Sequence, residues 1–181
     1  MNEILLKYAS PFDTKISELI DQLDSFQERL YPSESNHLEE REAMAKSNFK
    51  LIAAYIDNEP VGIGGVKLEQ NFGELKRFFI SESYRKSGIA NSIIITLENW
   101  LVHNKINCCY LETGIKQSEA INFYRNFGYS NCDPFGSYKE DSLSIFMTKE
   151  IDLKNYSPLF DLSDYYLVVF TSKLKEGITS E

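Results

Sequence analysis

The chain has few of the residues that form covalent or metal cross-links. Its 181 residues include three cysteines (Cys108, Cys109 and Cys132) and two histidines (His37 and His103). No C-x-x-C pair is present and the histidines are far apart in the sequence, which argues against a zinc site. The cysteine count is odd, and the N-terminus lacks a basic segment followed by an apolar one. Together these predict a reduced, cytoplasmic protein.

Positive charge is also scarce. Lys and Arg total 19 against 27 Asp and Glu, which gives a formal net charge of -8. This balance argues against nonspecific binding to nucleic acid or to an anionic membrane surface. No apolar run approaches the length needed to span a membrane. The acidity fits a cationic acceptor only weakly, and simple solubility explains it better. The length fits one domain with a core large enough to need no cross-link.

Cations nevertheless gather in one stretch, residues 74–90, with the sequence ELKRFFISESYRKSGIA. It is typical of a buried strand, a short loop and the first turn of a helix. Freed backbone N–H groups at a helix N-terminus, a glycine at position 88 and local positive charge together favour a phosphate ligand. We therefore expect this loop to hold the pyrophosphate of a ligand. The cations concerned are Lys76, Arg77, Arg85 and Lys86.

The sequence argues against two other nucleotide-binding patterns. The glycines of Val61-Gly-Ile-Gly-Gly65 lack a third glycine at the dinucleotide-binding spacing and open no helix. They indicate a bulge or close packing within a strand. A nucleotide-binding protein that uses loop 85–90 for ATP is disfavoured because the chain has no G-x-x-x-x-G-K-[ST] segment.

Hydrophobic periodicity predicts the order of the elements. Helix 89–105 joins strand 74–80 to strand 108–113, which predicts a βαβ unit with parallel strands. Simple alternation along strand 74–80 places Glu74, Lys76, Phe78 and Ile80 on one face and Leu75, Arg77 and Phe79 on the other. The other expected helices are 13–30, 38–46 and 117–127, and the other expected strands are 3–9, 49–56, 61–68, one beginning at 129–130, 143–148 and 165–170.

The chain divides at about residue 151. We expect residues 1–151 to form one domain and residues 152–181 to be a C-terminal extension that packs on this domain or extends it. The apolar segment 165–170, YYLVVF, is strongly strand-forming. We expect it to add to the sheet, either within the chain or across a dimer.

Several motifs in this order resemble one known family. Arg85-x-x-Gly88-x-Ala90 resembles the Q/R-x-x-G-x-G/A acetyl-CoA motif of the GNAT superfamily N-acetyltransferases. The resemblance covers about residues 3–151. It is strengthened by further segments that are similar to a bacterial subgroup of this family: Tyr31-Pro32…Asn36-His37, Glu74-x-Lys76-Arg77, Leu111-Glu112-Thr113-Gly114, Ala120-Ile121-x-x-Tyr124-x-x-x-Gly128-Tyr129, Phe135-Gly136-x-Tyr138 and Leu143-Ser144-Ile145-Phe146-Met147-x-Lys149.

This resemblance implies an α/β (α+β) fold. The expected sheet is mixed and mostly antiparallel, with a βαβ acetyl-CoA unit, helices on both faces and an extra C-terminal strand. Acetyl-CoA is the implied co-substrate, with no metal. Lys86 stands where most of the subgroup has glycine, so it restricts the backbone but adds a cation. The implied cofactor-binding residues are Phe78, Phe79, Ile80, Arg85, Lys86, Ser87, Gly88, Ile89, Ala90 and Gln117.

The implied reaction is transfer of an acetyl group to a primary amine within a ternary complex. Glu74 is the candidate general base, although it could instead pair with Lys76 or Arg77 as a structural ion pair. Tyr124 is the candidate general acid for the leaving thiolate, and the alternative is a core tyrosine on an amphipathic helix. A backbone N–H near Phe79 or Ile80 is expected to meet the oxyanion.

The acceptor side is less specified. Tyr31, Asn36 and His37 could form one wall of an acceptor pocket and Tyr138 the opposite wall, while a plain helix–helix connector is the alternative for residues 33–37. A small-molecule amine or a peptide amine is the expected acceptor, with no nucleic acid or membrane partner, in a monomer or homodimer. The rival hypothesis is a non-catalytic acyl-CoA-binding sensor or interaction module on the same fold.

Overall fold

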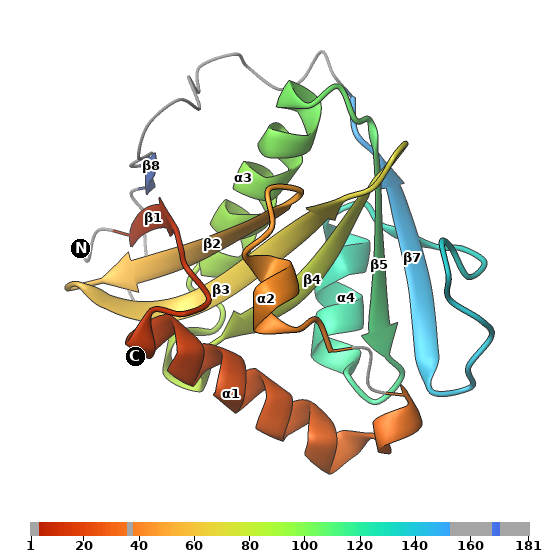
Figure 1. The fold of residues 1–181 in the computed structure, drawn as a ribbon, viewed down its shortest axis with the longest axis horizontal. Coiled ribbons are helices and arrows are strands. Elements are labelled where there is room, and N and C mark those ends of the chain that lie inside the picture. The colour runs from red at the N-terminus through yellow and green to blue at the C-terminus, as the bar shows by residue number, and fades with distance from the viewer. Residues whose placement is uncertain (1–3, 36–37, 153–167, 171–181) are drawn as a thin grey trace, which may run out of the picture.

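The structure is a computed structural model that describes residues 4–35, 38–152 and 168–170. It forms one mixed sheet with helices on both faces (Figure 1). Only the β4–β5 pair is parallel, and every other neighbouring pair in the described sheet is antiparallel. The predicted fold class is confirmed. Across the sheet the strands run β6 (Ser130–Asn131), β7 (Ser144–Glu150), β5 (Cys108–Gly114), β4 (Gly73–Ile80), β3 (Glu59–Leu68), β2 (Phe49–Ile56), β1 (Ile4–Tyr8) and β8 (Val168–Phe170).

The helices divide between the two faces. Helices α1 (Thr14–Leu30) and α2 (Arg41–Met44) cover one face, and α3 (Ile89–His103) and α4 (Ser118–Asn126) cover the other. Two single 3-10 turns, Ser33–Ser35 and Glu82–Tyr84, follow α1 and β4. The carboxylate of Asp13 caps α1 by accepting from the N–H groups of Lys15 and Ile16. Helix α2 is one turn, shorter than the expected 38–46.

Strand β2 explains why part of the sequence shows no alternation. Leu51 and Ala53 pack with the buried side chains of α1, and Ile52 and Ala54 pack with those of α3. A strand covered on both faces is apolar throughout. The apolar run 49–56 is therefore a central strand whose two faces belong to two separate parts of the core.

The predicted βαβ unit is present, and it opens at one end. Strands β4 and β5 are paired at only three positions, from Gly73 with Cys109 to Leu75 with Leu111. Strand β4 nevertheless continues to Ile80, and β5 continues to Gly114. Beyond Leu75, no described residue of β5 pairs with β4. The two parallel strands therefore diverge at the ends that carry the predicted site.

The predicted alternation along β4 is wrong beyond Lys76 because the strand contains a bulge. Arg77 has φ +58°. The pairing of β4 with β3 jumps from Lys76–Gly65 to Phe79–Ile63, so Arg77 and Phe78 together oppose Gly64. One extra residue shifts every later side chain to the other face.

As a result, Leu75 and Phe78 pack on the same side, in the part of the core that contains α3. Phe79 instead packs with α1. Gly64 permits this arrangement, since an added Cβ would lie 2.6 Å from Ile93 and 2.9 Å from Phe78. The expectation of close packing at the 61–65 glycines is confirmed here.

The far edge of the sheet involves the C-terminal segment. Val168–Phe170 pairs antiparallel with β1, with Val169 opposite Leu5. Residues 153–167 of the extension lie outside the described residues. Within the described residues, no helix is both long and apolar enough to cross a membrane.

Candidate active site

A pocket of about 860 Å³ lies beside the end of β4 where it leaves β5. We call it the loop pocket. Its walls are residues 78–80, the loop that follows, the start of α3 and the side of α4, with Leu23 and Phe26 of α1 opposite. Of the predicted cofactor-binding residues, it brings together Phe78, Phe79, Ile80, Arg85, Lys86, Gly88, Ile89, Ala90 and Gln117. Ser87 is not among its lining residues, and its hydroxyl donates to the carbonyl of Tyr84 at 2.6 Å.

The start of α3 offers backbone donors to this pocket. Gly88 is the N-cap at φ +88°, and it provides no side chain to cap the helix. The first intrahelical bond runs from the N–H of Ser92 to the carbonyl of Gly88. The N–H groups of the first turn therefore remain for a ligand, and the helix dipole favours an anion there. A Cβ at position 88 would meet nothing within 4 Å, so the glycine is needed for its φ angle.

Two cations flank these donors. The Arg85 Nε donates to the carbonyl of Ile80 at 3.2 Å, and its Nη1 lies 3.6 Å from a carboxylate oxygen of Glu119 across the pocket. Lys86 has φ +63°, a conformation that a lysine adopts only at a cost. The loop thus places two cationic side chains beside the free N–H groups, which is the arrangement expected for a pyrophosphate.

Tyr124 lines the loop pocket from α4 and is 6% exposed. Its ring meets those of Phe78 and Tyr129 edge-on, with ring centroids 6.1 and 5.8 Å apart. Burial raises the pKa of its hydroxyl well above the usual value of a tyrosine, and nearby Cys109 and Glu112 add to this effect. The phenol is therefore protonated at neutral pH, so it can act as a hydrogen donor.

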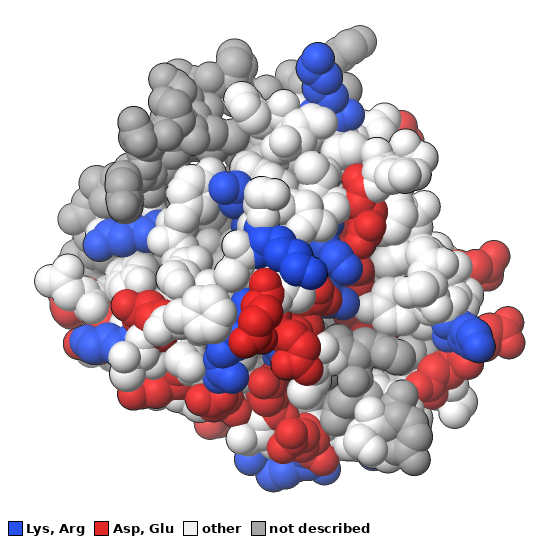
Figure 2. Space-filling model, in the orientation of Figure 1, with Lys and Arg blue, Asp and Glu red and all other residues white. Residues whose placement is uncertain are grey.

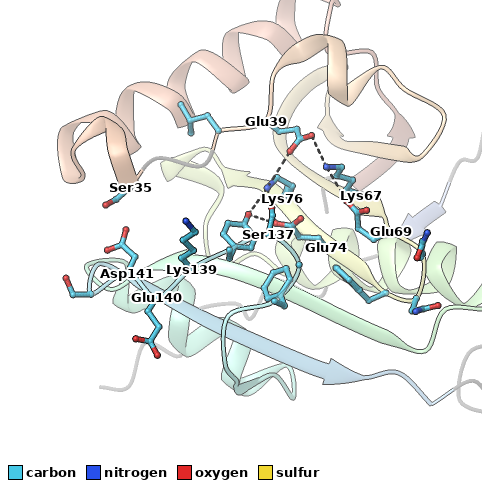
Figure 3. A pocket seen from close by; sticks show the side chains of 18 residues that line it. Ser35, Glu39, Lys67, Glu69, Glu74, Lys76, Ser137, Lys139, Glu140 and Asp141 are labelled. Carbon is cyan, nitrogen blue, oxygen red and sulfur yellow. Dashed lines mark hydrogen bonds and ion pairs between the residues drawn. The ribbon is translucent and has the colours of Figure 1, made fainter.

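A second pocket, of about 1110 Å³, lies on the α1–α2 side of the sheet. We call it the ionic pocket because a chain of charges crosses it. Glu39 reaches from the segment before α2 toward Lys67 and Lys76 on the strands (Figure 3), at 3.6 and 3.5 Å. Lys67 also pairs with Glu69 at 3.2 Å, and Lys76 with Glu74 at 2.9 Å. In the space-filling view, acidic and basic side chains lie intermixed near the centre of this face (Figure 2).

Glu74 lines the ionic pocket, on the far side of β4 from Tyr124. It is 6% exposed. Lys76 and the hydroxyl of Tyr138 both donate to its Oε1, at 2.9 and 2.5 Å. The pairing with Lys76 that the sequence offered as an alternative is present. The predicted acid and base thus lie in two pockets on either side of the diverging strands.

The remaining predicted acceptor residues are placed differently. Asn36 and His37 lie outside the described residues. Tyr31 is buried at the end of α1 and lines neither pocket. Its hydroxyl accepts from the N–H of Lys116 at 2.9 Å, and a Cβ at Gly114 would lie 2.1 Å from its ring. Tyr31 therefore fixes the turn between β5 and α4.

Glu112 is a candidate that the sequence interpretation missed. It is the first residue of β5 beyond the last pairing with β4, and it accepts from the Ser144 hydroxyl at 2.6 Å. Burial is the main cause of the raised pKa of Tyr124 and of Tyr138, and the charge of Glu112 contributes to both. Glu112 lines neither pocket, but its charge acts on Tyr124 in the loop pocket and on Tyr138 in the ionic pocket. The feature that could have indicated Glu112 from the sequence is its charge inside the otherwise apolar strand 108–113.

The comparison with protein families identifies the chain. The profile of the acetyltransferase (GNAT) family matches residues 16–129, which is more than half of the sequence. The chain belongs to the GNAT family of acetyltransferases. This assignment confirms the resemblance drawn from the motifs, and with it the prediction of an acetyltransferase enzyme.

Individual GNAT proteins show how far the similarity extends. The chain is 32% identical over 153 residues to an IAA acetyltransferase of Azospirillum brasilense, covering 83% of this chain and 100% of that protein. It is 31% identical over 123 residues to the uncharacterised N-acetyltransferase YsnE of Bacillus subtilis, covering 66% and 82%. The similarity thus extends over nearly the full length of one acetyltransferase.

Solved structures agree with the GNAT fold. A Klebsiella pneumoniae protein classed as an acyl-CoA N-acyltransferase superposes with a TM-score of 0.71 at 30% identity, over 82% of this chain and 98% of that one. The PaiA N-acetyltransferase of Thermoplasma acidophilum, solved with coenzyme A, gives 0.65 at 18% identity over 81% and 98%. The second similarity supports the fold alone.

Proposed function

We propose that this GNAT protein transfers the acetyl group of acetyl-CoA directly to a primary amine within a ternary complex. The divergence of β4 from β5 between two pockets carries this proposal. The loop pocket has the donors and cations for a pyrophosphate, and the ionic pocket has the carboxylates for an amine. An acetyl thioester that passes between the separated strands can be reached from the acceptor side.

The buried cysteine in the described part of the core is not a suitable nucleophile, which favours direct transfer over an acyl-enzyme. Cys109 is fully buried, and burial raises the pKa of its thiol to about 12. A thiol in this state is a poor nucleophile at neutral pH. Positioning of the two substrates and electrostatic stabilisation would then supply most of the acceleration.

The bulge in β4 offers the site for the developing oxyanion. Arg77 at φ +58° turns the backbone just before Phe78, on the stretch of β4 that has left β5. A backbone N–H near Phe79 or Ile80 would meet the thioester oxygen, and such a donor can supply about 3 kcal/mol of transition-state stabilisation. Tyr124, protonated at neutral pH, would then donate its proton to the departing thiolate.

Two carboxylates are candidates for the base that takes the amine proton. Glu74 lines the ionic pocket, and the charge of Glu112 acts on a tyrosine in each pocket. Either could act directly or through a water molecule. Replacing each with glutamine separates them, since the true base is the one whose loss lowers kcat with an unchanged Kd for acetyl-CoA.

The test of the proposed function is release of free coenzyme A from acetyl-CoA over a panel of small amines, amino acids and peptides. We expect turnover with at least one amine and none without an acceptor. Detection of the acetylated amine by mass spectrometry would identify the nitrogen that reacts. Binding of acetyl-CoA without turnover on any amine would instead favour the acyl-CoA-binding sensor.

Two further proposals concern the whole chain. Residues 152–181 would form an extension of the same domain, supported by the pairing of β8 with β1. The cytoplasm would be its compartment, supported by three cysteines that are all free. Fractionation of cells that express the tagged chain would check the second proposal.

A further inference from the structure

We propose that Tyr138 is a positioning residue for the acceptor amine. Its hydroxyl ties the β6–β7 loop (residues 132–143) to Glu74 and turns the second oxygen of that carboxylate toward the ionic pocket. This inference rests on the proposed function of that pocket as the acceptor site. It adds a role that neither the motif nor the family assignment gives to this tyrosine.

The hydrogen bonds around Glu74 form a closed triangle. The Nζ of Lys76 donates to the Tyr138 hydroxyl at 2.9 Å, and that hydroxyl donates to Glu74 Oε1 at 2.5 Å. Lys76 also donates directly to the same Oε1 at 2.9 Å. Both donors therefore hold one oxygen of the carboxylate. Among the residues that the structure describes, no group donates to the other oxygen, Oε2, which is therefore the oxygen available to a donor on the acceptor.

The phenol can serve only as a donor to this carboxylate. Its pKa is raised far above that of an ordinary tyrosine, first by burial and then by the charge of Glu74, with smaller contributions from Glu112 and Glu39. Tyr138 therefore keeps its proton at neutral pH. A neutral hydroxyl that accepts from Lys76 and donates to Glu74 has one fixed orientation, which suits a positioning role.

The ring of Tyr138 is held independently of its hydroxyl. It packs against the rings of Phe135 and Phe146, with centroids 5.0 and 5.5 Å apart. Phenylalanine at this position would keep these ring contacts and lose the hydroxyl, with its bonds to Glu74 and Lys76. The two contributions, packing and orientation of the carboxylate, can therefore be separated by one conservative substitution.

The experiment measures steady-state kinetics with the best amine from the panel. In Tyr138→Phe we expect the KM for the amine to rise about tenfold, because Glu74 then lacks the donor that orients its carboxylate toward the amine. We expect kcat to change by less than about threefold and the KM for acetyl-CoA to stay constant, because the loop pocket is untouched. Tyr110→Phe is the matched control. Its ring packs on Phe135 in the same cluster, and its hydroxyl interacts with Cys108 and Thr148 instead.

A double-mutant cycle tests whether Tyr138 acts through Glu74. If it does, the Glu74→Gln, Tyr138→Phe double variant has the same KM for the amine as Glu74→Gln alone. If the two substitutions instead raise the KM for the amine independently, so that their factors multiply in the double variant, the proposal is overturned. An unchanged KM for the amine in Tyr138→Phe would overturn it as well. So would a rise of this KM in Tyr110→Phe equal to that in Tyr138→Phe.

Amide hydrogen exchange of residues 132–143 gives a readout that needs no turnover. The amides of this loop should exchange faster in Tyr138→Phe than in wild type or in Tyr110→Phe. Equal exchange rates in the three proteins would show that the hydroxyl of Tyr138 does not hold the loop to Glu74. If wild type acetylates no amine, the proposed function fails, whereas the exchange data still decide whether the hydroxyl holds the loop.

Discussion

Lys86 adds a positive charge to the loop pocket at the cost of a strained backbone conformation. Its φ of +63° lies in the left-handed region, which costs an L-residue about 1–2 kcal/mol. A glycine would adopt this conformation freely. The side chain instead adds a cation to the loop pocket, beside Arg85 and the start of α3. We therefore expect this position to favour ligand binding over stability.

Lys86→Gly tests whether this position increases ligand affinity and lowers stability. We expect the Kd for acetyl-CoA to rise several-fold because a phosphate loses a cation, while the free energy of unfolding rises by up to about 1 kcal/mol as the strain is relieved. Isothermal titration and urea unfolding measure the two quantities. Lys105→Gly is the matched control, since Lys105 has φ +62° at the other end of α3. It should gain stability and leave the Kd unchanged, and a several-fold Kd change in both variants would contradict the explanation.

Tyr124→Phe tests the general acid. We expect kcat to fall about 100-fold because the thiolate then leaves without a proton from the enzyme, and the Kd for acetyl-CoA to stay within about twofold. Tyr55→Phe on β2 lines neither pocket and should retain full activity. Pre-steady-state and steady-state rates of coenzyme A release are the measurement. An unchanged kcat would return Tyr124 to the core role that the sequence left open.

Residue-level patterns identified some site residues and not others for a physical reason. Tyr124 could be predicted because helix spacing and a family motif coincide on one element. Glu112 could not be assigned a role, because its importance depends on where β4 stops pairing with β5. Glu39 gave no local signal at all. It enters the ionic pocket only through contacts with lysines of two distant strands.

At the scale of elements, the βαβ unit could be predicted, whereas the bulge inside it could not. The prediction assumed a strict two-residue alternation along β4. Arg77 breaks that alternation, and the break depends on Gly64 of the neighbouring strand, which leaves room for Phe78 and Ile93. Sequence periodicity reports a regular strand and contains no information about such a partner. The bulge nevertheless decides which face each later side chain occupies.

Arg77 also ties this bulge to α1. Its guanidinium bonds to the Asp24 carboxylate and to the main-chain carbonyl of Glu39, and its side chain is 6% exposed. Arg77→Met should lower the free energy of unfolding by about 2 kcal/mol, because Asp24 and the carbonyl lose their buried partner. Arg41→Met removes the ion pair between Arg41 and Asp21, which is more exposed. Asp21 lies on α1, as Asp24 does. This control should cost less than about 1 kcal/mol.

Urea unfolding compares the two arginine variants. Equal losses would show that Arg77 contributes no more than a surface ion pair. Because the segment that carries Glu39 is held by Arg77, we also expect the KM for the amine to rise in Arg77→Met and to stay at the wild-type value in Arg41→Met.

At the scale of the whole molecule, the C-terminal extension contributes the strand β8, which pairs with β1 at the edge of the sheet. Val168–Phe170 covers the outer edge of β1, so removal of residues 160–181 should expose that edge. We expect a lower melting temperature, a shift of the elution volume toward a dimer, or both. A truncated chain that melts and elutes like the full one would contradict the proposal that the extension is part of the domain.

The whole molecule also buries ionisable groups that must stay neutral, which makes it sensitive to alkaline pH. Burial raises the pKa of the Cys109 thiol to about 12, and it raises the pKa of Tyr124, Tyr129 and Tyr138 above the usual tyrosine value. In the unfolded chain these groups ionise near their ordinary values, about pH 9 and 10. Above those values the unfolded state loses protons that the folded state keeps, so the free energy of unfolding falls as the pH rises.

Each such group lowers the free energy of unfolding by up to about 1.4 kcal/mol per pH unit in this window, and stability should be level below about pH 8. Urea unfolding at about pH 8, 9.5 and 10.5 measures the slope. Cys109→Ala should lose stability at every pH from the cavity it creates. Its slope between about pH 9 and 10, where the thiol is the first group to ionise, should be smaller than that of wild type. A stability that stays level to about pH 10.5 would show that the buried phenols and thiol ionise as readily in the folded protein as in the unfolded chain.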